Sequence, residues 1–189
     1  MMHAMGAKDM IKDAFVRHRS VLENSAGAVI IEAARAADIL KGALAGGKKI
    51  FACGNGGSAA DAEHFIGELL CKYKEDRKPL PAISLVSPIS TLTAIANDYS
   101  YDDVFARQIE ALGEEGDVLV ALSTSGKSKN VLSALGAAQI KGLQTILLTG
   151  ASGKGAKADI VIAVPADETA RIQEMHELIY HAWCEFLDA

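Results

Sequence analysis

The sequence predicts an α/β fold, with a doubly wound, five-stranded parallel sheet, two extra N-terminal helices and a long C-terminal helix. Two observations carry this prediction. From residue 48 onward, short apolar runs alternate with longer amphipathic segments, which is typical of a parallel sheet covered on both faces. Half of the 189 residues are hydrophobic and only 5% are aromatic, a composition usual for α/β proteins with a sizeable core.

Two helices are predicted before the first strand, over residues 7–24 and 26–44, because both segments carry apolar residues at helical spacing. They lie outside the alternation of strands and helices. We therefore expect them to cover a face of the sheet or to contact another subunit. The whole chain is expected to form one domain over residues 1–189, with N-terminal helices at 1–47 and an α/β core at 48–189.

The alternating part of the chain contains five apolar runs that read as buried strands. The predicted strands are 49–53, 81–86, 117–122, 143–148 and 159–164. The predicted helices are 58–72, 89–97, 102–112, 128–141 and 169–187. Ligands of such sheets bind beyond the carboxyl ends of the strands.

Two loops rich in glycine and hydroxyl groups fall at such strand ends, at residues 54–58 and 123–128. Free N–H groups and the helix dipole at a helix N-terminus favour a phosphate. A P-loop is disfavoured because Ala121 stands where that motif needs its first glycine, and a dinucleotide site is weakly indicated because Glu75 and Asp76 lie in a charged loop. Either loop alone could be a simple tight turn, but together they indicate a phosphorylated small molecule.

Charge and cysteine content exclude several classes of protein. The net charge is −5 and no dense basic cluster is present, so nucleic acid is not expected as a partner. The three cysteines are far apart and form no CxxC pair, so neither a cysteine zinc site nor a disulfide framework is indicated. We expect a cytoplasmic protein without a membrane segment, because no apolar run suits a signal peptide or a membrane span.

Two polar patterns on helices are candidates for chemistry. His64 and Glu68 are four residues apart and share a helix face, which suits a metal or an acid/base pair as well as an ordinary exposed stripe. Gln173, Glu177 and His181 form a polar ridge opposite the apolar face of the last helix. That ridge is either solvent-exposed or able to reach a pocket of another subunit.

Two further residues of the last helix have expected structural roles. His176 borders the apolar face and is expected to be a half-buried structural histidine. Arg171 lies at the start of the helix, against its dipole, so we expect a nearby anion or carboxylate to hold it.

The combination of these motifs resembles the phosphoheptose isomerases, a family with the sugar isomerase (SIS) fold, over essentially the whole chain. The matching motifs are Cys53-Gly-Asn-Gly-Gly-Ser58, Asp61, His64 to Glu68, Ala96-Asn-Asp98, Ser123-Thr-Ser-Gly126 with Ser128, Arg171-Ile-Gln-Glu-x-His176, and His181. Each motif alone is weak, whereas the set is specific. The resemblance implies isomerisation of sedoheptulose 7-phosphate to D-glycero-D-manno-heptose 7-phosphate, the first step toward the heptose of bacterial lipopolysaccharide and other surface glycans.

The resemblance also implies a site, a cofactor and an assembly. Glu68 and His181 would be the catalytic acid/base pair. The substrate would contact Asn55, Gly56, Gly57, Ser58, Glu68, Asn97, Asp98, Ser123, Thr124, Ser125, Ser128 and Gln173. Zinc would be held by His64, Glu68, Gln173 and His181. The family forms homotetramers with sites built between subunits.

A second member of the fold remains an alternative at this point. The replication-initiator-associating proteins share most of the phosphate loops but bind a protein rather than catalyse. They resemble this chain less, because they lack the glutamate and the last-helix histidine that stand here as Glu68 and His181. Regulators with an SIS domain are a third class, but they carry an attached DNA-binding domain for which this sequence has no residues.

Overall fold

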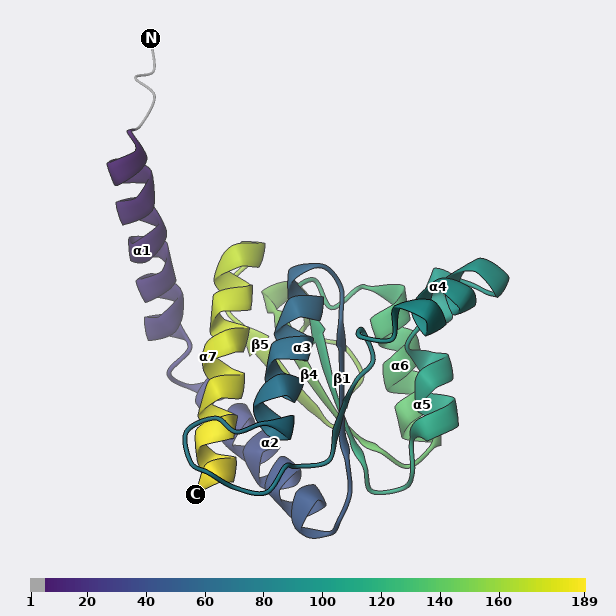
Figure 1. Ribbon diagram of the computed structural model, residues 1–189. Coiled ribbons are helices and arrows are strands. Elements are labelled where there is room, and N and C mark those ends of the chain that lie inside the picture. The colour runs from purple at the N-terminus through teal and green to yellow at the C-terminus, as the bar shows by residue number, and fades with distance from the viewer. Residues whose placement is uncertain (1–5) are drawn as a thin grey trace.

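Five parallel strands form the centre of the protein in the order β2-β1-β3-β4-β5 (Figure 1). The computed structural model describes residues 6–189. The strands are β1 (Ile50–Gly54), β2 (Ala82–Ser84), β3 (Val118–Ser123), β4 (Gln144–Gly150) and β5 (Ile160–Val164). All residues of β1 and β3 are buried, as expected for central strands of a sheet covered on both faces.

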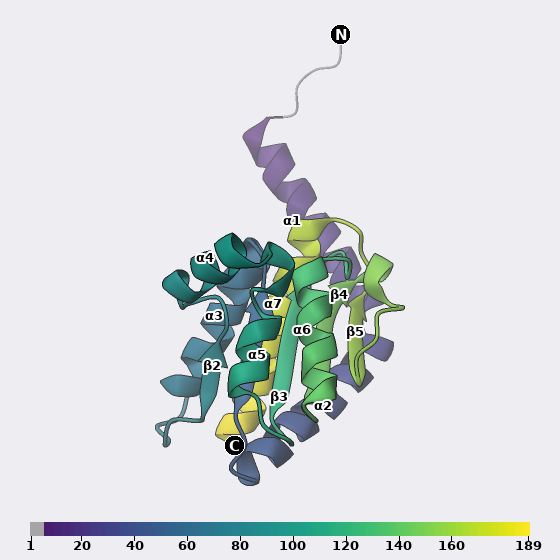
Figure 2. The same ribbon diagram turned by 90° about the vertical axis from the view of Figure 1, so that its right-hand side faces the viewer.

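Helices cover both faces of this sheet. The α-helices are α1 (Ala7–Asn24), α2 (Ala28–Ala45), α3 (Gly57–Leu70), α4 (Ile89–Asp98), α5 (Ala106–Leu112), α6 (Lys129–Ile140) and α7 (Thr169–Asp188). One hydrophobic core lies between the sheet and α2, α3 and α7, and a second lies between the sheet and α5 and α6 (Figure 2). The predicted doubly wound sheet is therefore confirmed.

The strand order brings the two predicted phosphate loops together. β1 pairs directly with β3, and Gly54 is the register partner of Leu122 at their carboxyl ends. The loop after β1 leads into α3 on one face, whereas the loop after β3 leads into α6 on the other. This is the point at which the chain changes its winding direction, where sheets of this class bind their ligands.

All five strands and the seven α-helices of residues 6–189 were predicted, but several boundaries differ. The predicted helix 102–112 is divided into a short 3₁₀ turn, Tyr101–Asp103, and α5. Val104 and Phe105, which separate the two pieces, are buried in the second core. The predicted strand 81–86 is reduced to the three residues of β2 at the edge of the sheet.

The first helix projects from the body of the protein and touches it near the start of α7 (Figure 1). No residue of α1 is buried, although Met10, Ile11 and Phe15 are apolar. By contrast, α2 packs on the sheet with Ala36 and Leu40 fully buried. Within residues 6–189, no helix combines the length and apolar character that a membrane span requires.

Candidate functional site

The loop after β1 is held beside the start of α6 by an amide pair. The Asn55 and Asn130 side chains exchange two hydrogen bonds, in which the Nδ2 of each donates to the Oδ1 of the other at 2.8 and 2.9 Å. The Tyr101 hydroxyl also donates to Asn55 Oδ1, at 2.9 Å. Asn55 is therefore oriented by two partners that sequence reasoning missed, since both lie more than 40 positions away along the chain.

Gly56 and Gly57 have separate structural reasons to be glycine. Gly56 adopts φ +57°, in the left-handed region that glycine tolerates best. Gly57 lies against Gln173, because a Cβ at Gly57 would lie 2.3 Å from Gln173 Nε2. The loop after β1 is thus in direct contact with α7. Ser58, which the resemblance assigned to the substrate, is only 4% exposed, and its substrate contact stays a prediction.

The loop after β3 gathers hydroxyl groups at the start of α6, of which Ser125 is exposed and Ser123 is buried. Ser123 Oγ donates to Ser128 Oγ at 3.1 Å, and Ser125 Oγ accepts from the backbone N–H of Lys127 at 3.2 Å. Ser128 is the N-cap residue, yet its side chain forms no capping bond in the described chain. Hydroxyl and N–H groups at the helix start therefore remain available for an anion.

The loop at the end of β4 supports the loop after β3, residues 123–128, which we call the hydroxyl loop. Thr124 O accepts from Gly150 N–H at 3.0 Å, and Ser125 O accepts from Ser152 Oγ at 3.1 Å. Because these two carbonyl oxygens accept hydrogen bonds from the neighbouring loop, they do not repel an anion bound on the opposite side of residues 123–128. Gly126, at φ +64°, packs so closely on Gly153 that a Cβ would lie 2.4 Å from its Cα.

Three predicted ligand residues come together between α3 and α7. The nitrogen or oxygen ligand atoms of His64, Glu68 and His181 all lie within 4.8 Å of one another. His64 Nε2 is 3.1 Å from Glu68 Oε1, and the His64 and His181 rings are 5.0 Å apart. All three belong to one chain, so the polar ridge of α7 meets α3 of the same subunit. Two imidazoles and a carboxylate form a donor set suited to zinc.

The surroundings of this group favour a positively charged ligand. Tyr180, which is 1% exposed, places its hydroxyl 3.0 Å from His64 Nδ1. Burial together with nearby carboxylates raises the pKa of Tyr180 above its ordinary value. Burial and the Glu177 carboxylate raise the pKa of Asp61 to about 6, against the opposing effect of His64. Asp61 Oδ2 is buried and has no hydrogen-bond partner among the described residues, so a cation nearby would relieve an unfavourable environment.

Two other predicted substrate residues are not joined to these elements. Asn97 Nδ2 donates to Asp98 Oδ1 at 2.8 Å at the exposed end of α4. Within residues 6–189, no hydrogen bond or ion pair connects either side chain with the hydroxyl loop or with the group between α3 and α7. Their assignment to the substrate stays a prediction.

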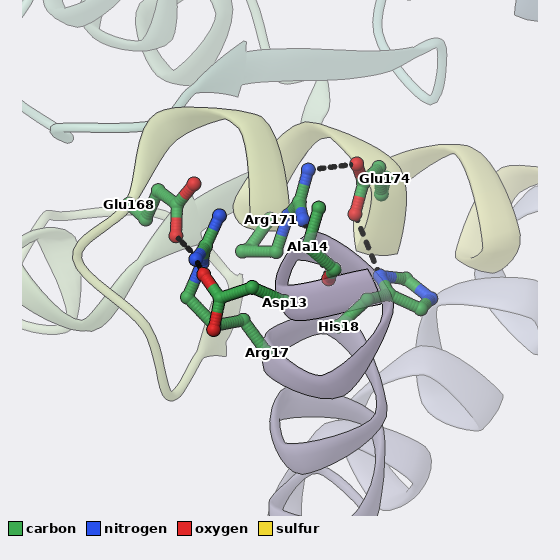
Figure 3. Close-up of polar contacts among 7 residues, drawn as sticks. All are labelled: Asp13, Ala14, Arg17, His18, Glu168, Arg171 and Glu174. Carbon is green, nitrogen blue, oxygen red and sulfur yellow. Dashed lines mark hydrogen bonds and ion pairs between the residues drawn. The ribbon is translucent and has the colours of Figure 1, made fainter. Parts of the chain in front are cut away.

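The start of α7 is tied to α1 by charged side chains (Figure 3). Arg171 Nη1 donates to Ala14 O at 2.8 Å, and its Nη2 contacts the Glu174 carboxylate. His18 Nδ1 lies 2.7 Å from the other oxygen of Glu174. The expectation that a carboxylate holds Arg171 is confirmed. His176, which also belongs to α7, was expected to be half-buried, but it is fully buried.

Comparison with known proteins gives a consistent family. Residues 17–150 match the model of the SIS domain, from the second half of α1 to the end of β4. A phosphoheptose isomerase of a Shewanella species (strain ANA-3) is 49% identical over 186 residues, covering 95% of this chain and 94% of the relative.

Two solved structures extend the similarity to three dimensions. A phosphoheptose isomerase from Francisella tularensis superposes with a TM-score of 0.93 at 39% identity, and one from Neisseria gonorrhoeae with a TM-score of 0.89 at 40% identity. Each match covers 97% of this chain and 99% of the other chain. With half of its residues identical to a relative matched over nearly its full length, the chain belongs to the phosphoheptose isomerase family of SIS-domain proteins.

Proposed function

We propose that this protein is an aldose–ketose isomerase that converts sedoheptulose 7-phosphate to D-glycero-D-manno-heptose 7-phosphate in heptose biosynthesis. The observation that carries the proposal is the convergence of His64, Glu68 and His181 within 4.8 Å on the two helices that border the loop after β1. Family membership supplies the substrate class. The replication-initiator-associating alternative is less well supported, because a binding protein has no need of such an acid/base group.

The phosphate would be held by the hydroxyl loop. Ser123, Thr124, Ser125 and Ser128 lie at the start of α6, where N–H groups and the helix dipole favour an anion. The polar groups of the loop after β1 would then contact the sugar. This division places the reacting end of the sugar toward α3 and α7.

The proposed chemistry is two proton transfers through a cis-enediol. A proton leaves C1 of the ketose and returns at C2, while a hydroxyl proton moves from O1 to O2. Glu68 is suited to the carbon step because a carboxylate can take and return one proton on one face of the sugar. His181 is suited to the oxygen step because an imidazole accepts and donates protons near neutral pH. Tyr180 would orient His64 through the contact at Nδ1.

Zinc is the proposed cofactor, held by His64, Glu68 and His181 with Gln173 as a further ligand. The donor set and the buried, unpartnered oxygen of Asp61 support a cation here. When bound, the metal would supply a Lewis acid that polarises the substrate carbonyl. A carboxylate that ligates a cation is a weaker base, so the two roles proposed for Glu68, metal ligand and base, would oppose each other.

The function is tested by ¹H NMR of the purified protein with sedoheptulose 7-phosphate, in which a growing aldose anomeric signal reports isomerisation. Glu68→Gln should reduce kcat by about 10²–10⁴-fold, as expected for loss of a general acid/base, while sugar phosphate still binds. Glu63→Gln is the matched control, because Glu63 lies on the same helix but bonds to Ser87. Near-normal turnover by Glu68→Gln would refute its role, and no aldose signal from the wild type would refute the function.

We also propose a homotetramer; the ligand group His64, Glu68 and His181 is assembled within one chain, so a second subunit would contribute to the remainder of the site. Met10, Ile11 and Phe15 on α1 are 60%, 60% and 75% exposed, which is costly for apolar side chains unless another subunit covers them. A cavity of about 720 Å³ between α2 and α7, lined by apolar residues including Trp183 and Phe186, supports the same interpretation. Phe15→Glu should lower the mass measured by light scattering. A fully active wild-type monomer would contradict the proposal.

A further inference from the structure

The segment between α3 and β2, residues 71–81, crosses the carboxyl end of α7 (Figure 1). It contacts both helices that carry the proposed acid/base pair. Its central residue is Arg77, whose side chain is 13% exposed. Arg77 Nε donates to Asp188 Oδ1 at 2.6 Å, near the end of α7. On the other side, Arg77 Nη2 donates to the backbone carbonyl of Glu68 at 2.9 Å, and Nη1 donates to that of Leu69 at 3.0 Å.

The contacts of Arg77 complete the carboxyl end of α3. The last carbonyl groups of a helix have no partner within it, and a guanidinium there satisfies them and complements the helix dipole. One of these carbonyl groups is that of Glu68, so the main chain of the proposed catalytic residue accepts a hydrogen bond directly from Arg77. The fixed fork of the arginine side chain makes this multiple contact possible, whereas lysine carries a single point of charge.

Asp188 is the matching anchor on α7. Its carboxyl group is 3% exposed and accepts from the backbone N–H groups of Lys74 at 2.7 Å and Glu75 at 3.1 Å, besides Arg77. Three donors for one buried carboxylate form a well-satisfied ion pair. The segment is therefore attached to the end of α7 by its backbone as well as by Arg77.

The same segment also contacts His181. The Tyr73 ring stacks on the His181 imidazole, with ring centroids 5.2 Å apart and planes inclined by 28°. Tyr73 directly precedes Lys74, whose N–H is held by Asp188, so the Arg77–Asp188 contact restrains Tyr73 too. At the other end of the helix pair, Gln173 lies on Gly57. The group between α3 and α7 is thus bounded by a contact at each end.

We propose that Arg77 and Asp188 are positioning residues that fix Glu68 and His181 relative to each other by joining the ends of α3 and α7 and seating Tyr73 on His181. Neither residue touches the substrate in this proposal, which rests on the proposed roles of Glu68 and His181. Partners of this kind, one layer outside a metal or acid/base group, change metal affinity or activity by about 10–100-fold when removed.

The first test uses metal-free protein, so it depends neither on catalysis nor on zinc. The variant Arg77→Met removes the donors and retains most of the side chain, and Lys78→Met is the matched control because the Lys78 side chain is exposed and makes no hydrogen bond or ion pair within residues 6–189. The imidazole C–H resonance of His181, assigned by its loss in His181→Gln, should shift or broaden in Arg77→Met and remain in place in Lys78→Met. An unchanged resonance in Arg77→Met would overturn the proposal.

The second test measures the zinc-loaded protein. Arg77→Met should weaken zinc affinity, measured by competition with a chromophoric chelator, and lower kcat, each by about 10–100-fold, with a smaller change in KM. A lower melting temperature with unchanged zinc affinity and kcat would show a merely structural role and overturn the proposal. If Arg77→Met does not fold, Arg77→Lys and Asp188→Asn are judged by the same measurements.

These experiments separate the proposal from the proposed function. If the wild type produces no aldose signal while Arg77→Met still alters the His181 resonance and zinc affinity, the function fails and the positioning role stands. If the wild type isomerises its substrate and Arg77→Met matches it in the His181 resonance, zinc affinity and kcat, the positioning role fails and the function stands.

Discussion

Acid sensitivity is the prediction that follows most directly from His176. This imidazole is 0% exposed, its Nε2 lies 3.4 Å from Thr149 O, and its Nδ1 has no partner among the described residues. Burial lowers the pKa of His176 from 6.5 to about 4, against the opposing effect of the Thr149 carbonyl. The folded protein therefore keeps this imidazole neutral, while the unfolded chain binds a proton below pH 6.5.

The sign and size of the effect follow from proton linkage. As the pH falls from 6.5 toward 4, only the unfolded state gains this proton, so the free energy of unfolding decreases. At about 1.4 kcal/mol for each pH unit, the interval gives a ceiling of about 3.5 kcal/mol, most of it expressed by pH 4.5. Below pH 4 the folded protein is protonated too, and the contribution stops growing.

The assay is urea unfolding followed by circular dichroism at pH 7.5 and pH 4.5, with a chelator present and at one protein concentration. His176→Gln should lose about 2–3 kcal/mol less than the wild type between these two pH values, although it is less stable at pH 7.5. His18→Gln is the control, because it leaves His176 in place. An equal loss of stability in wild type and His176→Gln would refute the reasoning.

Two further predictions concern the loops at the strand ends. Combining Ser125→Ala with Ser128→Ala should raise KM strongly, because each lost hydrogen bond to a charged group costs about 1.5–3 kcal/mol, whereas Lys127→Ala should raise KM only mildly; steady-state kinetics decides, and a larger effect of the lysine change would favour a P-loop-like site. Gly57→Ala should displace Gln173, because a Cβ at this position would lie 2.3 Å from Gln173 Nε2. The variant should bind zinc clearly more weakly while its melting temperature falls only slightly; unchanged zinc affinity would contradict this.

The five strands were predictable because each buried strand is a local apolar run, whereas their order in the sheet was not predicted. The five runs and the helices between them needed no knowledge of distant residues, and His64 and Glu68 share a face through helical spacing alone. The loops after β1 and β3 were predicted to lie at one edge, since parallel strands end together. The family motifs supplied the remaining site residues.

The contacts between helices were not predictable from the sequence. Whether His181 meets Glu68 depends on how α7 packs against α3, which is determined by buried side chains such as Phe65, Tyr180 and Trp183. The stacking of Tyr73 on His181 depends on a loop whose path no periodicity describes. The roles of zinc and of a second subunit stay predictions.

The exposed position of α1 makes it a reporter of assembly. Most of the stability of a helix in a protein comes from packing of its apolar face, and α1 is joined to the rest of the chain at the start of α7 without burying any residue. In a single subunit its amide hydrogens should therefore exchange with solvent almost as fast as those of a frayed terminus, far faster than the amides of β1 or β3. Protection of α1 that rises with protein concentration would measure subunit association directly, without reference to catalysis.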